Sequence, residues 1–288
     1  MAVVVTARTG MYAMVITMMR RFAMGVEYDG TAYCGWQRQP HAPSVQALVE
    51  KAVSRVADHA LQVVCAGRTD TGVHATGQVI HFETGADRTN RSWLLGTNAN
   101  LPRDIRSQWV LPAETGFHAR FSALARSYRY IILNQSLGSA LWRDRVCWEH
   151  RQLDEHRMQQ GACYLVGEHD FTSFRSLACQ AKNPVRTIEN LRVTRNGKYL
   201  TIDVVANAFL HHMVRTIAGV LIAVGSGEKK PDWIQEVLEC RDRKKSGVTA
   251  PASGLYLVGV RYPREFGFPA GGDMPLPGQT GKNPCRAS

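Results

Sequence analysis

The stretch CAGRTDTGVHATGQVIHF combines three glycines with a closely spaced pair of opposite charges. Arg68 and Asp70 are two residues apart, so in extended backbone their side chains share a face and can meet. A cation at that distance keeps a carboxylate ionised, and Gly67, Gly72 and Gly77 allow a substrate to approach the backbone closely. An ionised carboxylate on such a loop can serve as a nucleophile, a general base or a metal ligand.

A salt bridge that only stabilises a turn is the alternative interpretation of this pair, and the length of the connection weighs against it. The flanking runs LQVVCA and QVIHF have the β-branched residues and the alternation of strands. A hairpin between two strands needs about two to five residues, whereas this connection extends over residues 67–77. The additional length favours a functional loop.

The elements around this loop follow the order β-α-β-β-α-β. A strand, FAMGVEY, precedes a helix that Ser44 is expected to cap, with Val45, Leu48 and Val56 on its apolar face at helical spacing. The two strands that flank the loop come next, followed by a helical stretch, RSWLLGTNAN, and the strand SQWVL. This order is typical of a ferredoxin-like fold.

The second half of the chain repeats the same order. The strand ARSYRYIILN is followed by a helix over Leu153–Val166 and by a hairpin through Asn196 and Gly197, the strongest short turn signal in the chain. An apolar helix over Leu210–Val224 and the strand GLYLVGVRYP complete the pattern. The equivalent hairpin therefore closes tightly in this half, and the fold itself does not require the long loop of the first half.

These patterns predict an α+β fold with four segments. Residues 1–21 form an N-terminal extension that we expect to be disordered, and residues 22–112 form the half that carries the Arg-Asp loop. Residues 113–266 form the second half, and residues 267–288, rich in Gly and Pro, form a disordered tail.

Composition favours a polyanionic partner and an intracellular setting. The 288-residue chain has a formal net charge of +11 and a sequence pI near 9.5, which suits nucleic acid. Seven cysteines without a C-x-x-C motif are expected to remain reduced thiols, as in a cytoplasmic protein. No signal peptide and no membrane span are predicted.

The loop and several other motifs resemble the tRNA pseudouridine synthase A family. The family signature G-R-T-D-x-G-V-H matches GRTDTGVH, and the resemblance continues in YDGTAYCGWQRQ, NANLP, FHARFSALARSYRY, FTSF, NAFLHHMVR and GLYLVGV. These motifs cover Phe22 to about Phe266 in the order of the family. The resemblance implies two ferredoxin-like halves in one large mixed, mostly antiparallel sheet flanked by helices, with a basic cleft between the halves.

The resemblance also implies the reaction. Members isomerise uridine to pseudouridine at positions 38, 39 and/or 40 in the anticodon stem-loop of tRNA, without metal or cofactor, and act as homodimers. Asp70 corresponds to the essential carboxylate, and the residues leave open whether it attacks C1′, adds to C6 or removes the C2′ proton. Because a stacked uridine hides its glycosidic bond, the base must be flipped out, a role that Arg68 would fill.

Further positions acquire roles only through the resemblance. Tyr128 corresponds to an active-site tyrosine that stacks on the uracil, Arg215 to a second cation that holds Asp70, and Leu255 to a substrate-binding position. The RNA-contacting positions that the resemblance implies are Arg88, Phe117, His118, Ala119, Arg120, Phe121, Ala178, Cys179, Gln180, Ala181 and Lys182. Ser136 stands where the family often has a cation, which leaves RNA contacts near it open.

Two rival functions remain at this point. A metal-dependent phosphoesterase acting on RNA would use Asp29 and Asp70 and lose activity in chelator, and a tRNA-binding module would leave uridines unchanged. No metal site is predicted, because His211 and His212 are adjacent and so are expected to face different directions rather than to form an i, i+4 pair. We therefore expect these histidines to be structural or to face RNA.

Overall fold

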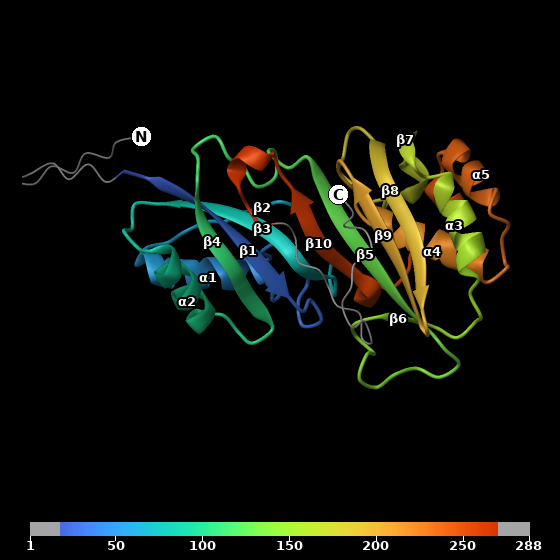
Figure 1. The fold of residues 1–288 in the computed structure, drawn as a ribbon, viewed down its shortest axis with the longest axis horizontal. Helices are drawn as coiled ribbons and strands as arrows, with labels where there is room; N and C mark the ends of the chain where they lie inside the picture. The colour runs from blue at the N-terminus through green and yellow to red at the C-terminus, as the bar shows by residue number, and fades with distance from the viewer. Residues whose placement is uncertain (1–17, 270–288) are drawn as a thin grey trace, which may run out of the picture.

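The computed structural model describes residues 18–269 and shows an elongated molecule built on one sheet of ten strands (Figure 1). The strands are β1 (Arg20–Tyr28), β2 (Val64–Cys65), β3 (His74–Thr84), β4 (Ile105–Ala113), β5 (Ala125–Asn134), β6 (Cys147–Glu149), β7 (Gly167–Asp170), β8 (Val185–Asn196), β9 (Tyr199–Ala206) and β10 (Leu255–Arg261). The helices are α1 (Val45–Ala57), α2 (Asn90–Asn100), α3 (Glu155–Cys163), α4 (Met213–Gly225) and α5 (Trp233–Cys240).

The two halves have the same strand order. In the first half the order across the sheet is β4-β1-β3-β2, and in the second half it is β10-β5-β9-β8. Both correspond to the fourth, first, third and second strands of a β-α-β-β-α-β unit. The predicted pair of ferredoxin-like halves in one mixed, mostly antiparallel sheet is therefore confirmed.

The halves are joined in the middle of the sheet, where β3, β10 and β5 run side by side (Figure 1). Strand β10 pairs in parallel with β3 through Tyr256 opposite His74 and Leu257 opposite Ala75. On its other edge β10 pairs antiparallel with β5 from Leu255 to Arg261. The last strand of the second half thus lies against the strand that follows the Arg-Asp loop.

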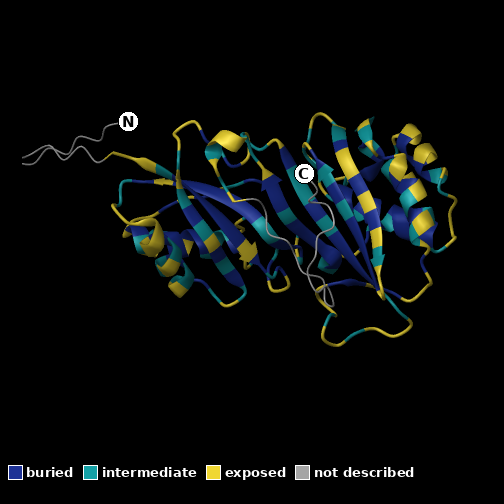
Figure 2. Cartoon of the chain, viewed as in Figure 1, coloured by how far each residue is buried: buried dark blue, intermediate teal, exposed yellow. Residues whose placement is uncertain are grey.

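Burial follows the predicted helical and strand patterns (Figure 2). On α1, Val45 and Val53 are completely buried, and Leu48 and Val56 are partly buried against the core, as their helical spacing predicts. Val49, which lies outside the predicted face, is also completely buried. Ser44 does occupy the N-cap position of this helix, but its hydroxyl makes no capping hydrogen bond and is buried without a partner. The position was predicted correctly and the capping contact was not.

The tight turn of the second half is also confirmed. Asn196 pairs with Tyr199 at the end of the β8–β9 hairpin. The two residues between them are Gly197 and Lys198, so the turn lies one position after the predicted Asn196-Gly197 pair and Asn196 ends β8. Gly197 has a φ of 57°, a left-handed conformation that favours glycine.

The ordered region extends past both predicted boundaries. Arg20 and Arg21, which we placed in the extension, belong to β1. Phe268, which we placed in the tail, stacks on Trp109 with 5.5 Å between ring centroids and meets Phe117 edge-on at 4.8 Å. Aromatic packing and strand pairing therefore move both boundaries outward; residues 1–17 and 270–288 lie outside the described residues.

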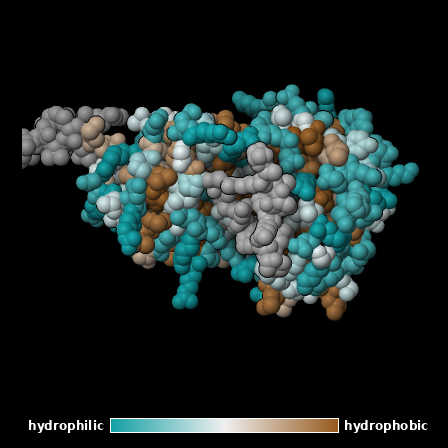
Figure 3. Space-filling model, viewed as in Figure 1, coloured by the Kyte–Doolittle hydropathy of each residue, from teal (hydrophilic) through white to brown (hydrophobic). Residues whose placement is uncertain are grey.

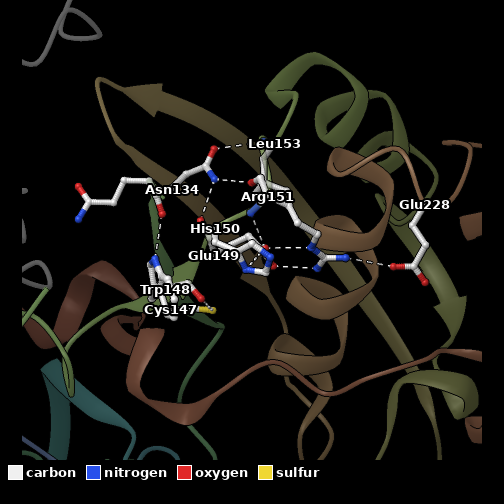
Figure 4. Close-up of polar contacts among 9 residues, drawn as sticks. Asn134, Cys147, Trp148, Glu149, His150, Arg151, Leu153 and Glu228 are labelled. Atoms are coloured by element: carbon white, nitrogen blue, oxygen red, sulfur yellow. Dashed lines mark hydrogen bonds and ion pairs between the residues drawn. The ribbon is translucent and has the colours of Figure 1, made fainter. Parts of the chain in front are cut away.

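A polar network fixes the short strand β6 to the rest of the second half (Figure 4). Arg151 makes two hydrogen bonds to the Glu149 carboxylate, at 2.9 and 2.8 Å, and a third to Glu228 at 3.2 Å. This contact holds the pKa of the Glu149 carboxyl below its usual value. The Asn134 amide donates to the carbonyls of Glu149 and Arg151, so the end of β5, β6 and the residues after α4 are tied together.

The visible surface is mostly hydrophilic, with hydrophobic atoms at the lower edge of the second half (Figure 3). The segment between β5 and β6 lies along this edge (Figure 1). Leu137 and Leu141 in this segment are 77% and 84% exposed. Among the described helices, none combines the length and the apolar character needed to cross a bilayer.

Candidate active site

The Arg-Asp loop is folded back against the first half rather than extended. The amide of Trp36 donates to the Thr69 carbonyl at 3.0 Å, and the Val73 amide donates to the Asp70 carbonyl at 3.1 Å. The buried Thr69 hydroxyl lies 2.8 Å from the Tyr28 hydroxyl. These bonds turn Thr69 into the core and bend the chain at Asp70.

Asp70 is held by three side chains from the start of α4. His211 Nε2 lies 3.2 Å from Asp70 Oδ1, and His212 Nε2 lies 3.5 Å from Oδ2. Arg215 Nη1 lies 3.5 Å from Oδ2, as expected for a second cation, and its Nε donates to the Ala250 carbonyl at 2.9 Å. The carboxylate of the first half is therefore oriented by a helix of the second.

The prediction that the adjacent histidines face different directions is wrong. His212 has a φ of 65°, in the left-handed region that few residues other than glycine adopt. This conformation breaks the usual divergence of consecutive side chains, and both Nε2 atoms reach Asp70. Burial lowers the pKa of the His212 imidazole, and the negative charge of Asp70 opposes that shift.

Arg68 makes no ion pair with Asp70, contrary to our expectation for extended backbone. Its side chain is exposed, and no hydrogen bond or ion pair involves it within residues 18–269. The physical reason is that Thr69 turns into the core, so the side chains of Arg68 and Asp70 on either side of it point in different directions. Arg68 therefore remains available at the surface of the loop, and the cation that pairs with Asp70 is Arg215 of α4 instead.

Tyr128 on β5 faces the loop, as its place on one strand face with Arg126 and Tyr130 predicts. A Cβ atom at Gly67 would lie 3.7 Å from the Tyr128 hydroxyl, so only a small residue leaves this approach open. Burial raises the pKa of this hydroxyl above its usual value, and the nearby negative charge of Asp70 raises it further. Tyr128 is thus a neutral hydrogen-bond donor beside the carboxylate.

Comparison of the sequence with known proteins shows which family the chain belongs to. A family model described as tRNA pseudouridine synthase matches residues 24–122 and 162–263. A tRNA pseudouridine synthase A from Vibrio atlanticus is 55% identical over 249 residues, covering 86% of this chain and 94% of that protein. Its counterpart from Alcanivorax borkumensis is 53% identical over 259 residues, covering 90% and 96%. The chain belongs to the tRNA pseudouridine synthase family.

More distant structures show only a slight likeness. A Cbf5-Nop10-Gar1 complex aligns with 70% of this chain and 45% of its own chain, at 12% identity and a TM-score of 0.34. The family assignment rests on the sequence matches, and the resemblance recognised from GRTDTGVH and the other motifs is confirmed by them.

The segment around FHARF divides between core and surface. Phe117 and Ala119 are completely buried, so their side chains are not available to RNA, contrary to the expectation for these two positions. The Phe121 ring is 76% exposed and lies between two polar neighbours. The His118 ring stacks on it at 4.3 Å, and the Arg120 guanidinium lies 5.5 Å from its centroid.

The loop at residues 178–182 lies close to Asp70 through the backbone. The Ser176 amide donates to the His211 carbonyl at 2.8 Å, and the Cys179 amide donates to the Ser176 carbonyl at 3.0 Å. The segment that leads into this loop is therefore bonded to His211, one of the residues that hold Asp70, and Lys182 in the loop is exposed.

Three other predicted positions have different surroundings. Arg88 is exposed before α2 and donates to the Val56 carbonyl at 3.2 Å. Leu255 is buried at the start of β10, opposite Tyr130. Asp29, the second carboxylate of the phosphoesterase alternative, is paired with other groups, and no hydrogen bond or ion pair joins it to Asp70 among the described residues.

Sequence reasoning missed two contributors to the site. His211 and His212 were in a quoted motif, but a left-handed residue cannot be inferred from adjacent histidines. Phe209 meets the Tyr128 ring edge-on, with centroids 5.0 Å apart. Its place two residues before His211 is the only signal that could have indicated this contact.

Proposed function

We propose that this chain isomerises uridine to pseudouridine at positions 38, 39 and/or 40 in the anticodon stem-loop of tRNA. The observation that carries the proposal is the Asp70 carboxylate, presented by the family signature loop and held by His211, His212 and Arg215. A carboxylate surrounded by cations and donors remains ionised, as nucleophilic or basic action requires.

The reaction needs no net change in composition. The N1–C1′ bond of the uridine breaks, the uracil turns, and C5 forms a new bond to C1′. The proton at C5 is then lost and N1 gains one. Asp70 opens this sequence by attack on C1′, addition to C6 or removal of the C2′ proton, and Tyr128 stacks on the uracil and moves the C5 proton.

Arg68 acts as the wedge that replaces the flipped base. Its exposed side chain and the absence of an ion pair with Asp70 support this role. A planar guanidinium can fill the vacated place in a base stack, and a flipped uridine exposes the glycosidic bond.

The basic charge of the chain and two exposed segments support binding of the anticodon arm in a cleft between the halves. Phe121 with Arg120 and His118 offers a stacking surface for an unpaired base. Lys182 and its neighbours supply a second contact beside the active site, and Arg88 contacts a phosphate further away. Leu255 and Arg215 complete the substrate site.

The protein acts as a cytoplasmic homodimer in this proposal. The family resemblance carries both statements, and light scattering of the purified protein tests the dimer. The exposed Leu137 and Leu141 offer an apolar surface for a second copy.

Mapping pseudouridine in tRNA from cells that lack this protein tests the proposal. We expect loss of pseudouridine at one or more of positions 38, 39 and 40 and its return when purified protein is added to that tRNA. Activity that persists in EDTA excludes the metal-dependent phosphoesterase. Binding of tRNA with no pseudouridine formed, by protein with native thermal stability, would instead favour the binding module.

A further inference from the structure

The side chains that meet at the start of α4 have the donor set of a metal site. The ligand atoms of Asp70, His211 and His212 all lie within 4.8 Å of one another. His211 Nε2 lies 3.2 Å from Asp70 Oδ1, and His212 Nε2 lies 3.5 Å from the other carboxylate oxygen, Oδ2. Ligands at 2.0–2.1 Å around a tetrahedral zinc ion are about 3.3 Å apart. We propose that these three residues bind a divalent ion such as Zn²⁺, and that its binding stops isomerisation.

The type of ligand selects the type of ion. Two imidazoles and one carboxylate suit Zn²⁺ or Co²⁺, whereas Mg²⁺ prefers oxygen ligands in an octahedron. The His211 side chain is 41% exposed, which gives an ion a route from solvent. The positive charge of Arg215 beside Oδ2 opposes a dication, so the affinity is expected to be below that of structural zinc sites.

A bound ion would inhibit rather than assist. It would occupy the carboxylate that has to react with the nucleotide, and it would hold both histidines away from their present contacts. Inhibition rests on the proposed function of Asp70, whereas binding of the ion does not. Measuring both separates a failure of this inference from a failure of the proposed reaction.

Calorimetric titration with ZnCl₂ tests the site directly. We expect one ion per chain for the intact protein and at least a tenfold weaker affinity for His212→Gln. His156→Gln, which changes an exposed histidine on α3, is the matched control and should bind Zn²⁺ like the unchanged chain. Pseudouridine formation should fall as the site fills and recover with EDTA.

Titration with Co²⁺ distinguishes this site from the cysteines. An ion held by nitrogen and oxygen shows visible ligand-field bands without thiolate charge-transfer absorption. A thiolate band, or an unchanged affinity in His212→Gln, would overturn the proposal. If His212→Gln does not fold, His211→Gln decides in the same way, because its backbone is not in the left-handed region.

A second observation, independent of the first, concerns Arg126 on β5. Its guanidinium donates to four main-chain carbonyls: those of Ala66 at 3.1 Å, Arg120 at 2.6 Å, Ala123 at 3.2 Å and Asn207 at 2.9 Å. Burial lowers the pKa of this guanidinium, which remains charged at neutral pH.

These carbonyls belong to three separate segments that each lead into the site. Ala66 precedes the loop of Asp70, Arg120 lies in the exposed stacking segment, and Asn207 precedes the residues that contact Asp70. We infer that Arg126 is a positioning residue that sets the distance between these segments. A lysine ammonium, with a single point of attachment, cannot reach all four acceptors.

Arg126→Lys should lower kcat by roughly tenfold to a hundredfold, since a misplacement of about 1 Å can cost that much. We expect a smaller change in KM. The matched control is Arg195→Lys, which changes an arginine whose acceptors, Glu155, Asn134 and Leu153, all lie in the second half. It should leave kcat within a factor of two.

Chemical rescue distinguishes a positioning role from a purely structural one, because added guanidinium restores activity only in the first case. Guanidinium ion at concentrations below those that unfold the protein should restore part of the activity of Arg126→Ala and none in Arg195→Ala. Native kcat in Arg126→Lys, or a loss of kcat as large in Arg195→Lys, would overturn the inference. Thermal unfolding of all variants shows that the measured protein is folded.

Discussion

The two halves join their equivalent central strands, β2–β3 and β8–β9, with connections of very different length. In the second half β8 and β9 are joined at Gly197, which has a φ of 57° and where an added Cβ atom would meet nothing within 4 Å. In the first half the chain between β2 and β3 runs from Ala66 to Val73 and is fixed by bonds to Trp36, Tyr28 and Arg126. The short connection only reverses the chain, and the long one presents a carboxylate to the other half.

The difference shows where the site depends on long-range contacts. Nothing within the long connection neutralises Asp70; the groups that do so come from α4, which is more than a hundred residues away in the chain. The tight turn has no such dependence. Changes in the long loop should therefore affect activity more than stability, whereas changes in the tight turn should affect stability alone.

The largest expected effect comes from replacing the carboxylate of the long connection by an amide, and the matched control replaces the amide at the tight turn by a carboxylate. Asp70→Asn should abolish pseudouridine formation while the fold and tRNA affinity remain, because the amide is nearly isosteric but is neither nucleophile nor base. Asn196→Asp should leave activity unchanged, since Asn196 is the last residue of β8 and is not one of the groups that hold Asp70. The readout is pseudouridine formed by pure protein. Turnover by Asp70→Asn would remove this residue from the mechanism.

Tyr128→Phe tests the hydroxyl that faces the long loop. The ring and its contact with Phe209 remain, but the donor beside Asp70 is lost. If the hydroxyl moves the C5 proton, the rate should fall by roughly a hundredfold or more, with a bound intermediate accumulating in a single-turnover experiment. Unchanged single-turnover kinetics would show that only the ring is needed.

Much of the fold was predictable because its signals are local. The helical spacing of Val45, Leu48 and Val56 and the turn signal at Asn196-Gly197 each depend on neighbours in the chain. The family motifs predicted a contact between Asp70 and Arg215, and the two side chains lie 3.5 Å apart.

The rest of the site depends on backbone conformations and contacts that the sequence does not display. The left-handed backbone of His212 brings two consecutive imidazoles together, and the inward turn of Thr69 separates Arg68 from Asp70. The four acceptors of Arg126 lie in segments that only the folded sheet assembles. Pattern and spacing predict elements, whereas these arrangements arise from tertiary packing.

Arg68→Lys separates base flipping from any influence on Asp70. Lysine keeps the charge but loses the planar group that can replace a base, and a lost charge-assisted contact is worth about 1.5–3 kcal/mol. On a folded anticodon arm the rate should fall by roughly one to two decades, because about 1.4 kcal/mol is tenfold. On an unstructured strand, with less stacking to overcome, the loss should be smaller. Equal losses on both substrates would assign Arg68 to orienting Asp70 instead.

The smallest expected effect distinguishes the two connections most directly, because the same change can be made in each. Gly72 and Gly197 have φ values of 74° and 57°, and a Cβ atom would meet only Ala252 at 3.5 Å in the first case and nothing in the second. Alanine at either position should therefore cost about 1–2 kcal/mol for the left-handed backbone, lowering Tm by about 2–4 °C per kcal/mol in a chain of this size. Only Gly72→Ala should also lower kcat, by a few-fold, because relief of that strain displaces the neighbouring Asp70. Thermal unfolding and single-turnover rates of the two variants provide the comparison. A loss of activity of equal size in Gly197→Ala would mean that the rate follows global stability, and that the long loop is not mechanically separate from the rest of the fold.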